Sequence, residues 1–385
     1  VFLIILSEGL ANVLSFYFIN TKTAFLAAVG KNYLINIFEI ITKVVAYGVK
    51  IVLLINKVDI VLVQVGFFIC SLIKIVLYLI YFRRKYKKIN FYSKIAKKQK
   101  LEDKNSYLIT EIAWTIFSST DAIILSIFIS TALSSVYSIY SMVFVSLSGL
   151  LNSVYLSINY ILGQTFHNDI EKYKRTHNIF NSVFMTCITI LMSTCYLLII
   201  PFIKIYTYGV TDIDYFIKGL PLLFASIQML SWSRYVAGNL SGVAGYAKQT
   251  SYISIIETVL NLTLSIVLVN FMGIIGVLLA TLVSLPLKVI YLNILCEKKI
   301  LKRNPFQTIA IIVVNFFLFF TVVVLEEALH LSNLIGMNIL KFLLFGLIFF
   351  LVISLITFLV NLFICPDLFA KIKIILKNKG ESCAK

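Results

Sequence analysis

The sequence predicts an all-α, polytopic membrane protein with about eleven transmembrane helices, and three observations lead to this fold class. The 385 residues are 60% hydrophobic and only 13% charged, and their mean hydropathy is +0.97. Soluble domains carry about 25% charged residues, so a water-soluble fold could not cover this much apolar surface. The apolar residues also fall in runs long enough to cross about 30 Å of hydrocarbon as helices.

The expected membrane-spanning helices follow directly from these runs. They lie at about residues 1–18, 33–55, 60–82, 108–130, 136–160, 179–203, 219–240, 251–271, 274–296, 305–325 and 339–363. The chain starts with Val1 inside the first run, with no basic segment and no small-residue cleavage site that would indicate a signal peptide. We therefore expect an N-terminally incomplete chain.

Basic residues alternate sharply between successive connections. One set of connections, which includes 19–32, 83–107 and 364–385, holds 25 Lys and Arg residues, whereas the alternate set holds 3. Because Lys and Arg collect in cytoplasmic loops, the first set is predicted to be cytoplasmic. The net charge of +17 thus reflects membrane topology, and we expect no nucleic-acid partner.

Three charged residues within spans form the main candidate site. Arg234, Glu257 and Lys288 lie six to eight residues from the predicted cytoplasmic ends of three consecutive helices. This places them at one depth, about 9–12 Å inside the membrane boundary. Two cations and one anion leave a net positive charge that suits a phosphate-bearing substrate. The alternative interpretation is an Arg234–Glu257 pair that only holds two helices together.

Three further residues are candidates for the transport machinery. Lys43 shares one helical face with Glu39 and Lys50, so it either faces a cavity or pairs with Glu39 within the helix. Asp121, in the middle of its span, either carries a coupling proton or cation or is a hydrogen-bonded structural acid. Pro286 removes one backbone donor and is predicted to kink its helix, as is common near transport sites.

Small and sulfur-containing residues suggest structural roles. Helix 136–160 carries small residues at near four-residue spacing, which predict close helix packing. These residues are Ser141, Ser146, Gly149, Ser153 and Ser157. The tyrosines of the same helix, Tyr137, Tyr140 and Tyr155, either pack or face sugars across a hydrated cavity. The six cysteines form no CxxC pair and no metal-like grouping with the three histidines, so we expect no disulfide, metal or other cofactor.

Five segments carry a family resemblance that covers most of the chain. They are AVGKNYLINI (28–37), TDAIILSIFISTALSSVYSIYSMVF (120–144), PFIKIYTYGVTDIDY (201–215), LPLLFASIQMLSWSRYVAGNLSGVAGYAKQT (220–250) and IETVLNLTLSIVLVNFMGIIGVLLATLVSLP (256–286). They resemble segments of Wzx-type polysaccharide flippases, in the superfamily that includes MATE drug exporters and the lipid II flippase.

This resemblance implies a MATE-like two-lobe bundle with an incomplete first lobe, because the family usually has about fourteen helices. About three N-terminal helices are then absent. The implied regions are 1–82, the remaining part of the N-terminal lobe; 83–107, a basic cytoplasmic linker; 108–296, a C-terminal six-helix lobe; 305–363, two additional helices; and 364–385, a cytoplasmic basic tail.

The resemblance also implies a function and partners. The expected activity is translocation of undecaprenyl-diphosphate-linked oligosaccharide repeat units across the bacterial plasma membrane by alternating access, with no enzymatic step. These units serve capsule, O-antigen or cell-wall polysaccharide synthesis. Expected partners are the polyprenyl-diphosphate oligosaccharide, membrane lipids, and a polysaccharide polymerase with its chain-length machinery. A cationic cavity is common in such proteins, and Arg234 and Lys288 fit one.

Three other functions compete with this interpretation. A MATE-like small-molecule antiporter for organic cations would present an acidic cavity, whereas the spans here hold six basic and five acidic residues. A membrane polysaccharide polymerase or glycosyltransferase carries acidic catalytic residues in a large outer loop, and the predicted outer connections are short. A purely structural subunit does not need charges within its spans. The sequence therefore favours the flippase.

Overall fold

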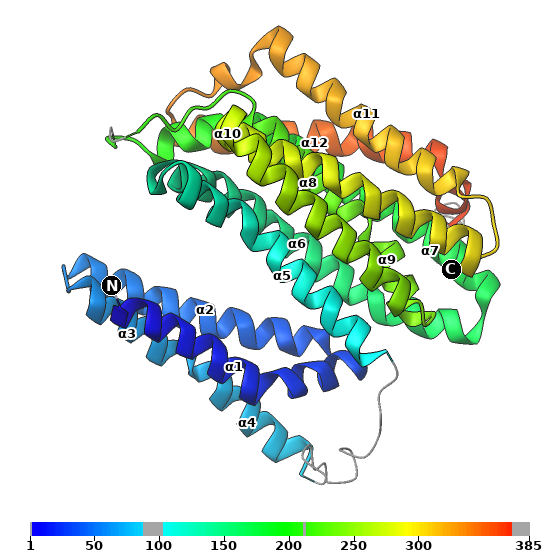
Figure 1. The fold of residues 1–385 in the computed structure, drawn as a ribbon, viewed down its shortest axis with the longest axis horizontal. Coiled ribbons are helices and arrows are strands. Elements are labelled where there is room, and N and C mark those ends of the chain that lie inside the picture. Colours follow the sequence, from blue (N-terminus) through cyan, green and yellow to red (C-terminus); the bar gives the residue numbers. More distant parts are fainter. Residues whose placement is uncertain (1, 88–102, 211–212, 372–385) are drawn as a thin grey trace, which may run out of the picture. The chain divides into compact units, whose positions relative to one another are not determined.

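The computed structural model describes residues 2–87, 103–210 and 213–371, which are almost entirely helical (Figure 1). No β-strand occurs in these three ranges. Seven helical segments are long and apolar enough to cross a membrane: Ile60–Lys85, Lys104–Phe128, Thr131–Asn168, Ile170–Tyr206, Ala247–Ile300, Phe306–Leu329 and Ile339–Ile364. The chain is thus a multi-pass, all-α membrane protein, as the sequence predicted.

The predicted spans coincide with helices or with pairs of helices. The α-helices are α1 (Phe2–Ala28), α2 (Asn32–Ile55), α3 (Ile60–Ser71), α4 (Ile73–Lys85), α5 (Lys104–Phe128), α6 (Thr131–Asn168), α7 (Ile170–Tyr206), α8 (Leu220–Ser233), α9 (Tyr235–Val243), α10 (Ala247–Ile294), α11 (Phe306–Leu329) and α12 (Ile339–Ile364). A π-helical turn, η2 (Leu295–Ile300), continues α10, and a short 3₁₀ helix, η3 (Leu331–Leu334), follows α11.

Two expected connections are mostly helical instead. Helix α1 continues ten residues beyond its predicted end, so Lys22 lies within it, buried, with its Nζ donating to the Phe18 carbonyl at 2.6 Å. Only Asp169 separates α6 from α7, and its carboxylate caps α7 by accepting from the Lys172 amide at 3.0 Å. Helices of this length exceed the hydrocarbon thickness, and their polar ends therefore extend beyond it.

The chain divides into two compact units, which we describe separately. The first contains α1–α4 and a short piece of α6, Leu156–Ile161, and the second contains the rest of the described chain. The first is held together by an aromatic cluster in which Phe38 meets Tyr78 edge to face, with ring centres 4.9 Å apart. Most of the predicted linker 83–107 and the end of the predicted tail 364–385 lie outside the described residues.

Helices α7 and α10 organise the second unit. Helix α10 packs along α5 and α8, while α11 and α12 pack against α7 (Figure 1). Inside the α7–α11–α12 contact, the Asn315 amide donates to the Asn361 side chain at 2.9 Å, and both residues are fully buried. Uncharged amide pairs of this kind join helices where water is absent.

Helix α6 contacts α8 through aromatic side chains. Tyr140 and Phe144 both stack on Phe224, with ring centres 5.9 and 5.5 Å away. By contrast, a Cβ built on Gly149 would meet no atom within 4 Å among the described residues. The expectation that the small residues of this helix allow close packing is therefore wrong at its centre, because large rings set the distance between the helices.

Helix α10 consists of two arms that meet at a glycine. Gly273 has φ 58° and ψ −134°, a conformation that only glycine adopts readily, and the predicted boundary between spans 251–271 and 274–296 falls at this residue. Three residues later, a Cβ on Gly276 would lie 2.2 Å from the Leu268 carbonyl oxygen. The second arm therefore passes directly against the backbone of the first.

Gly276→Ala should destabilise the protein by about 3 kcal/mol, because a methyl group there overlaps rigid backbone rather than a movable side chain. Gly149→Ala is the matched control, since its site is open and alanine favours a helix by up to about 1 kcal/mol. Thermal unfolding of the purified variants in detergent measures both. Equal melting temperatures for the two variants would contradict the close contact at Gly276.

Candidate functional site

The three charged residues predicted to share one depth are in contact. Glu257, on the first arm of α10, forms an ion pair with Arg234 Nη1 through Oε1. Its Oε2 lies 3.3 Å from Lys288 Nζ on the second arm. Glu257 therefore bridges the two cations, and Lys288 is part of the cluster rather than a separate charge.

Local backbone features bring these side chains together. Arg234 occupies the junction at which the predicted helix 219–240 divides into α8 and α9. The turn at Gly273 folds α10 back on itself, so that Glu257 and Lys288 face each other from its two arms. The result is a contact between segments that are consecutive in the sequence but run in opposite directions.

The cluster is almost completely buried within the protein. The exposed fractions of the side chains are 5% for Arg234, 2% for Glu257 and 9% for Lys288. The Arg234 guanidinium also lies over two rings of α5, 5.4 Å from the centre of Trp114 and 5.9 Å from that of Phe117. Such cation–π contacts are strengthened by loss of water. Two cations and one carboxylate leave the buried group with one net positive charge.

A cavity of about 380 Å³ borders this cluster, and both cations line it. Its other lining residues are Thr110, Glu111, Trp114, Tyr155, Tyr235, Gly238, Asn239, Thr250 and Leu292. Glu257 is not among them, so the cluster contributes its two cations, and not its carboxylate, to the cavity wall. An anionic group that entered the cavity would therefore meet cations first, next to aromatic rings and amide or hydroxyl groups.

Two aromatic lining residues, Trp114 and Tyr235, were missed by sequence reasoning. They contribute aromatic surface beside Tyr155, whose place in a cavity wall the sequence had left open, and Tyr155 meets Tyr235 edge to face with ring centres 5.5 Å apart. Aromatic rings are also common in helix cores, so composition alone does not distinguish a cavity wall from packing. The exposed Glu111 adds a carboxylate to the wall. Glu111 and Trp114 are three residues apart and so share one face of α5, and this spacing could have indicated from the sequence that both line the same cavity.

Lys43 does not form the intrahelical pair with Glu39. Glu39 instead pairs with Lys74 of α4, with Nζ and Oε1 3.2 Å apart, and Lys43 is exposed without an ion pair in the described part of the chain. A neutralising i, i+4 pair is therefore the wrong interpretation for these two residues. Lys43 belongs to the first unit, and its role in substrate binding stays a prediction.

Asp121 is buried among hydroxyl groups. Thr281 Oγ1 lies 3.3 Å from both carboxylate oxygens, and Tyr137 Oη lies 3.4 Å from Oδ2. Asn261 in turn donates to Thr281 Oγ1 at 2.8 Å. These hydrogen-bonded side chains come from α6 and α10, and all of them are neutral. Asp121 is thus hydrogen-bonded but has no cation at contact distance in the described residues.

Pro286 lies within the second arm of α10, which remains helical around it. The non-helical dihedral angles of α10 occur at Gly273 instead, thirteen residues earlier. The chain therefore reverses direction at Gly273, and this turn, rather than Pro286, brings Lys288 to the charged cluster. The predicted kink at Pro286 stays a prediction.

Comparison with known proteins gives a match in fold. No protein-family model and no curated protein matches the sequence. The solved structure of the lipid II flippase MurJ, in an inward closed conformation, matches with a TM-score of 0.59 and 17% sequence identity. The match covers 92% of this chain and 73% of that chain. The chain is therefore similar in fold to a multi-pass helical flippase.

Arg234→Ala should reduce stability by about 3 kcal/mol, because it removes one partner of a buried carboxylate and leaves only Lys288 to compensate it. Arg234→Lys keeps the charge and should recover part of this loss, although an ammonium does not reproduce the guanidinium contacts. Thermal unfolding in detergent checks both variants. A melting temperature of Arg234→Ala within one degree of wild type would show that the pair contributes little to the fold.

Proposed function

We propose that this protein is a flippase that translocates undecaprenyl-diphosphate-linked oligosaccharide repeat units across the bacterial plasma membrane by alternating access. The observation that carries the proposal is the buried Arg234–Glu257–Lys288 cluster, whose two cations line a cavity. Cations within the membrane are costly unless anions compensate them, and Glu257 balances only one of these two, so a lipid-linked diphosphate is a membrane anion suited to the cluster. The similarity in fold to MurJ supports this class of substrate.

The wall of the cavity suits the rest of this substrate. Trp114 and Tyr235 offer aromatic surface against which the C–H groups of a sugar can pack, and Asn239 offers both a donor and an acceptor. The cations would hold the diphosphate while these neutral groups contact the glycan. The product would serve capsule, O-antigen or cell-wall polysaccharide synthesis, with a polymerase and its chain-length machinery acting on it afterwards.

The charge of the site also separates this proposal from its competitors. A MATE-like antiporter for organic cations needs carboxylates directed at its substrate, whereas Glu257 is covered by two cations here. The exposed Glu111 is the acidic residue of the wall. A polymerase or glycosyltransferase would need a paired acid and base near a sugar acceptor. The cluster instead provides fixed positive charge, which is suited to binding.

Lys288→Ala should lower affinity for a short-chain prenyl-diphosphate disaccharide at least tenfold, because it removes one of the two cations that line the cavity. Stability should change less than for Arg234→Ala, since Glu257 keeps its contact with Arg234. Lys288→Arg should retain part of the affinity. Binding is measured by calorimetry on the purified protein, and translocation of the full-length lipid is measured in reconstituted vesicles.

The matched control is Lys341→Ala, which removes an exposed cation at the start of α12 and should leave binding unchanged. Wild-type affinity in Lys288→Ala would assign the cluster to structure alone. The flippase proposal itself fails if wild-type protein binds the diphosphate no better than the corresponding prenyl alcohol glycoside.

We further propose that Asp121 carries the coupling proton. Its described partners are hydroxyl groups, so an ionised carboxylate there is uncompensated within the membrane. The side chain is therefore stable in its protonated form, or when water enters to hydrate the ionised form. Asp121→Asn mimics the protonated form and should fold normally. It should abolish the dependence of translocation on an imposed pH gradient, measured in vesicles with and without an ionophore. An unchanged response to the gradient would make Asp121 a structural acid.

A further inference from the structure

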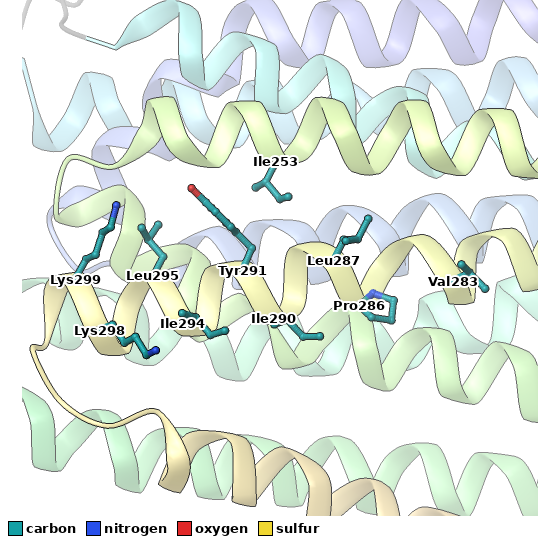
Figure 2. Close-up of a pocket in the computed structure, with 10 residues that line it drawn as sticks. All are labelled: Ile253, Val283, Pro286, Leu287, Ile290, Tyr291, Ile294, Leu295, Lys298 and Lys299. Carbon is teal, nitrogen blue, oxygen red and sulfur yellow. The ribbon is translucent and has the colours of Figure 1, made fainter.

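The second arm of α10 carries two parallel rows of side chains outside the charged cluster. One row runs from Val283 to Lys299 and the other from Pro286 to Lys298, both in steps of four residues. Residues spaced by four form ridges on a helix surface. Figure 2 shows Leu287, Tyr291, Leu295 and Lys299 on one side of the helix and Pro286, Ile290, Ile294 and Lys298 on the other. Each ridge is apolar along its length, apart from the hydroxyl group of Tyr291, and ends in a lysine.

The ridge that ends in Lys298 lies between two hollows. The first, of about 590 Å³, touches both ridges and Ile253 of the first arm (Figure 2). The second, of about 440 Å³, lies between the same ridge and α11, which contributes Val313 and Phe316. Three residues line both hollows: Pro286, Ile290 and Ile294. Two apolar channels therefore run side by side, separated by one row of side chains.

A buried ion pair holds the acidic residue that precedes the two lysines. Glu297, only 1% exposed, pairs with Arg303 and accepts a hydrogen bond from Thr308 Oγ1 at 2.6 Å. This contact turns the acidic residue of η2 inward, and the next two residues, Lys298 and Lys299, are exposed. They lie at the end of the membrane-spanning segment Ala247–Ile300. Lysines at this position reach toward lipid headgroups.

We propose that this face binds an anionic phospholipid. One acyl chain lies in each hollow, on either side of the ridge formed by Pro286, Ile290 and Ile294, and the phosphate lies between Lys298 and Lys299. The ridge from Pro286 to Lys298 spans twelve residues, about 18 Å, which is close to half the hydrocarbon thickness and so to one leaflet. The same helical arm presents Lys288 to the charged cluster, so the bound lipid packs on the helix that carries this cation.

The presence of two hollows beside the lysines favours a two-chain phospholipid over a polyprenyl lipid or a protein helix. A polyprenyl lipid has a single chain and would fill one hollow only. A helix from another protein, or from a second copy, would need acidic residues placed opposite both lysines. A glycerophospholipid provides two chains and one phosphate in the arrangement that the surface offers.

Native mass spectrometry of the purified protein in detergent tests the proposal. Titration compares phosphatidylglycerol with phosphatidylcholine of identical acyl chains. Wild type should bind phosphatidylglycerol at least fivefold more tightly. The double variant Lys298→Gln/Lys299→Gln should lose this preference. Ile290→Trp, which places a bulky ring between the two hollows and keeps the lysines, should weaken binding of both lipids at this site.

The matched control is Lys172→Gln/Lys248→Gln, which removes two exposed lysines from other parts of the second unit and should retain the preference. Equal affinity for the two lipids in wild type would overturn the proposal. A wild-type preference for phosphatidylglycerol in the double variant would also overturn it. Displacement of phosphatidylglycerol by equimolar undecaprenyl phosphate would assign the face to a polyprenyl lipid instead. A dimer that forms only without lipid and is lost in Ile290→Trp would assign it to a second copy of the chain. These binding results do not depend on transport.

Discussion

The arrangement of the second unit depends on the burial of one carboxylate. Glu257 is 2% exposed in a segment that crosses the membrane, where an unpaired charge is strongly unfavourable. It needs cations at contact distance, and it takes one from the α8–α9 junction and one from the second arm of α10. The lateral position and the register of three helical segments are thus linked through a single side chain.

The turn at Gly273 explains why this contact is possible. Glu257 lies sixteen residues before the glycine and Lys288 fifteen residues after it. Because both arms rise by the same distance per residue, a sharp reversal returns the chain to the same depth at these two positions. The close approach at Gly276 keeps the arms near each other. The backbone geometry of two glycines therefore determines the electrostatics at the other end of the helices.

Polar residues within the membrane serve two different purposes in this unit. Asn315 and Asn361 bond mainly to each other and to Thr189, join α11 and α12 to α7, and are fully buried. The charged cluster, in contrast, borders a cavity. Neutral amides can satisfy one another completely, whereas the cluster keeps one unbalanced positive charge. This difference separates polar residues that join helices from a site that is suited to a ligand, and both occur in a fold similar to that of MurJ.

Much of the fold follows from local properties of the chain. The apolar runs predict the spans because hydrocarbon thickness and helical rise leave little choice of length. The common depth of Arg234, Glu257 and Lys288 follows in the same way, from residue counts along helices. Helix ends were less predictable, since the polar residues near Lys22 and Asp169 suit a helix as well as a loop.

Only the tertiary structure decided which partners these residues take. Glu39 pairs with Lys74 rather than with Lys43, because rotation of α2 about its axis and packing against α4 determine which side chains meet. Glu257 contacts Lys288 as well as Arg234, and Trp114 and Tyr235 line a cavity rather than a core. Sequence determines the depth of a residue along a helix axis, but its lateral neighbours depend on how the helices pack together.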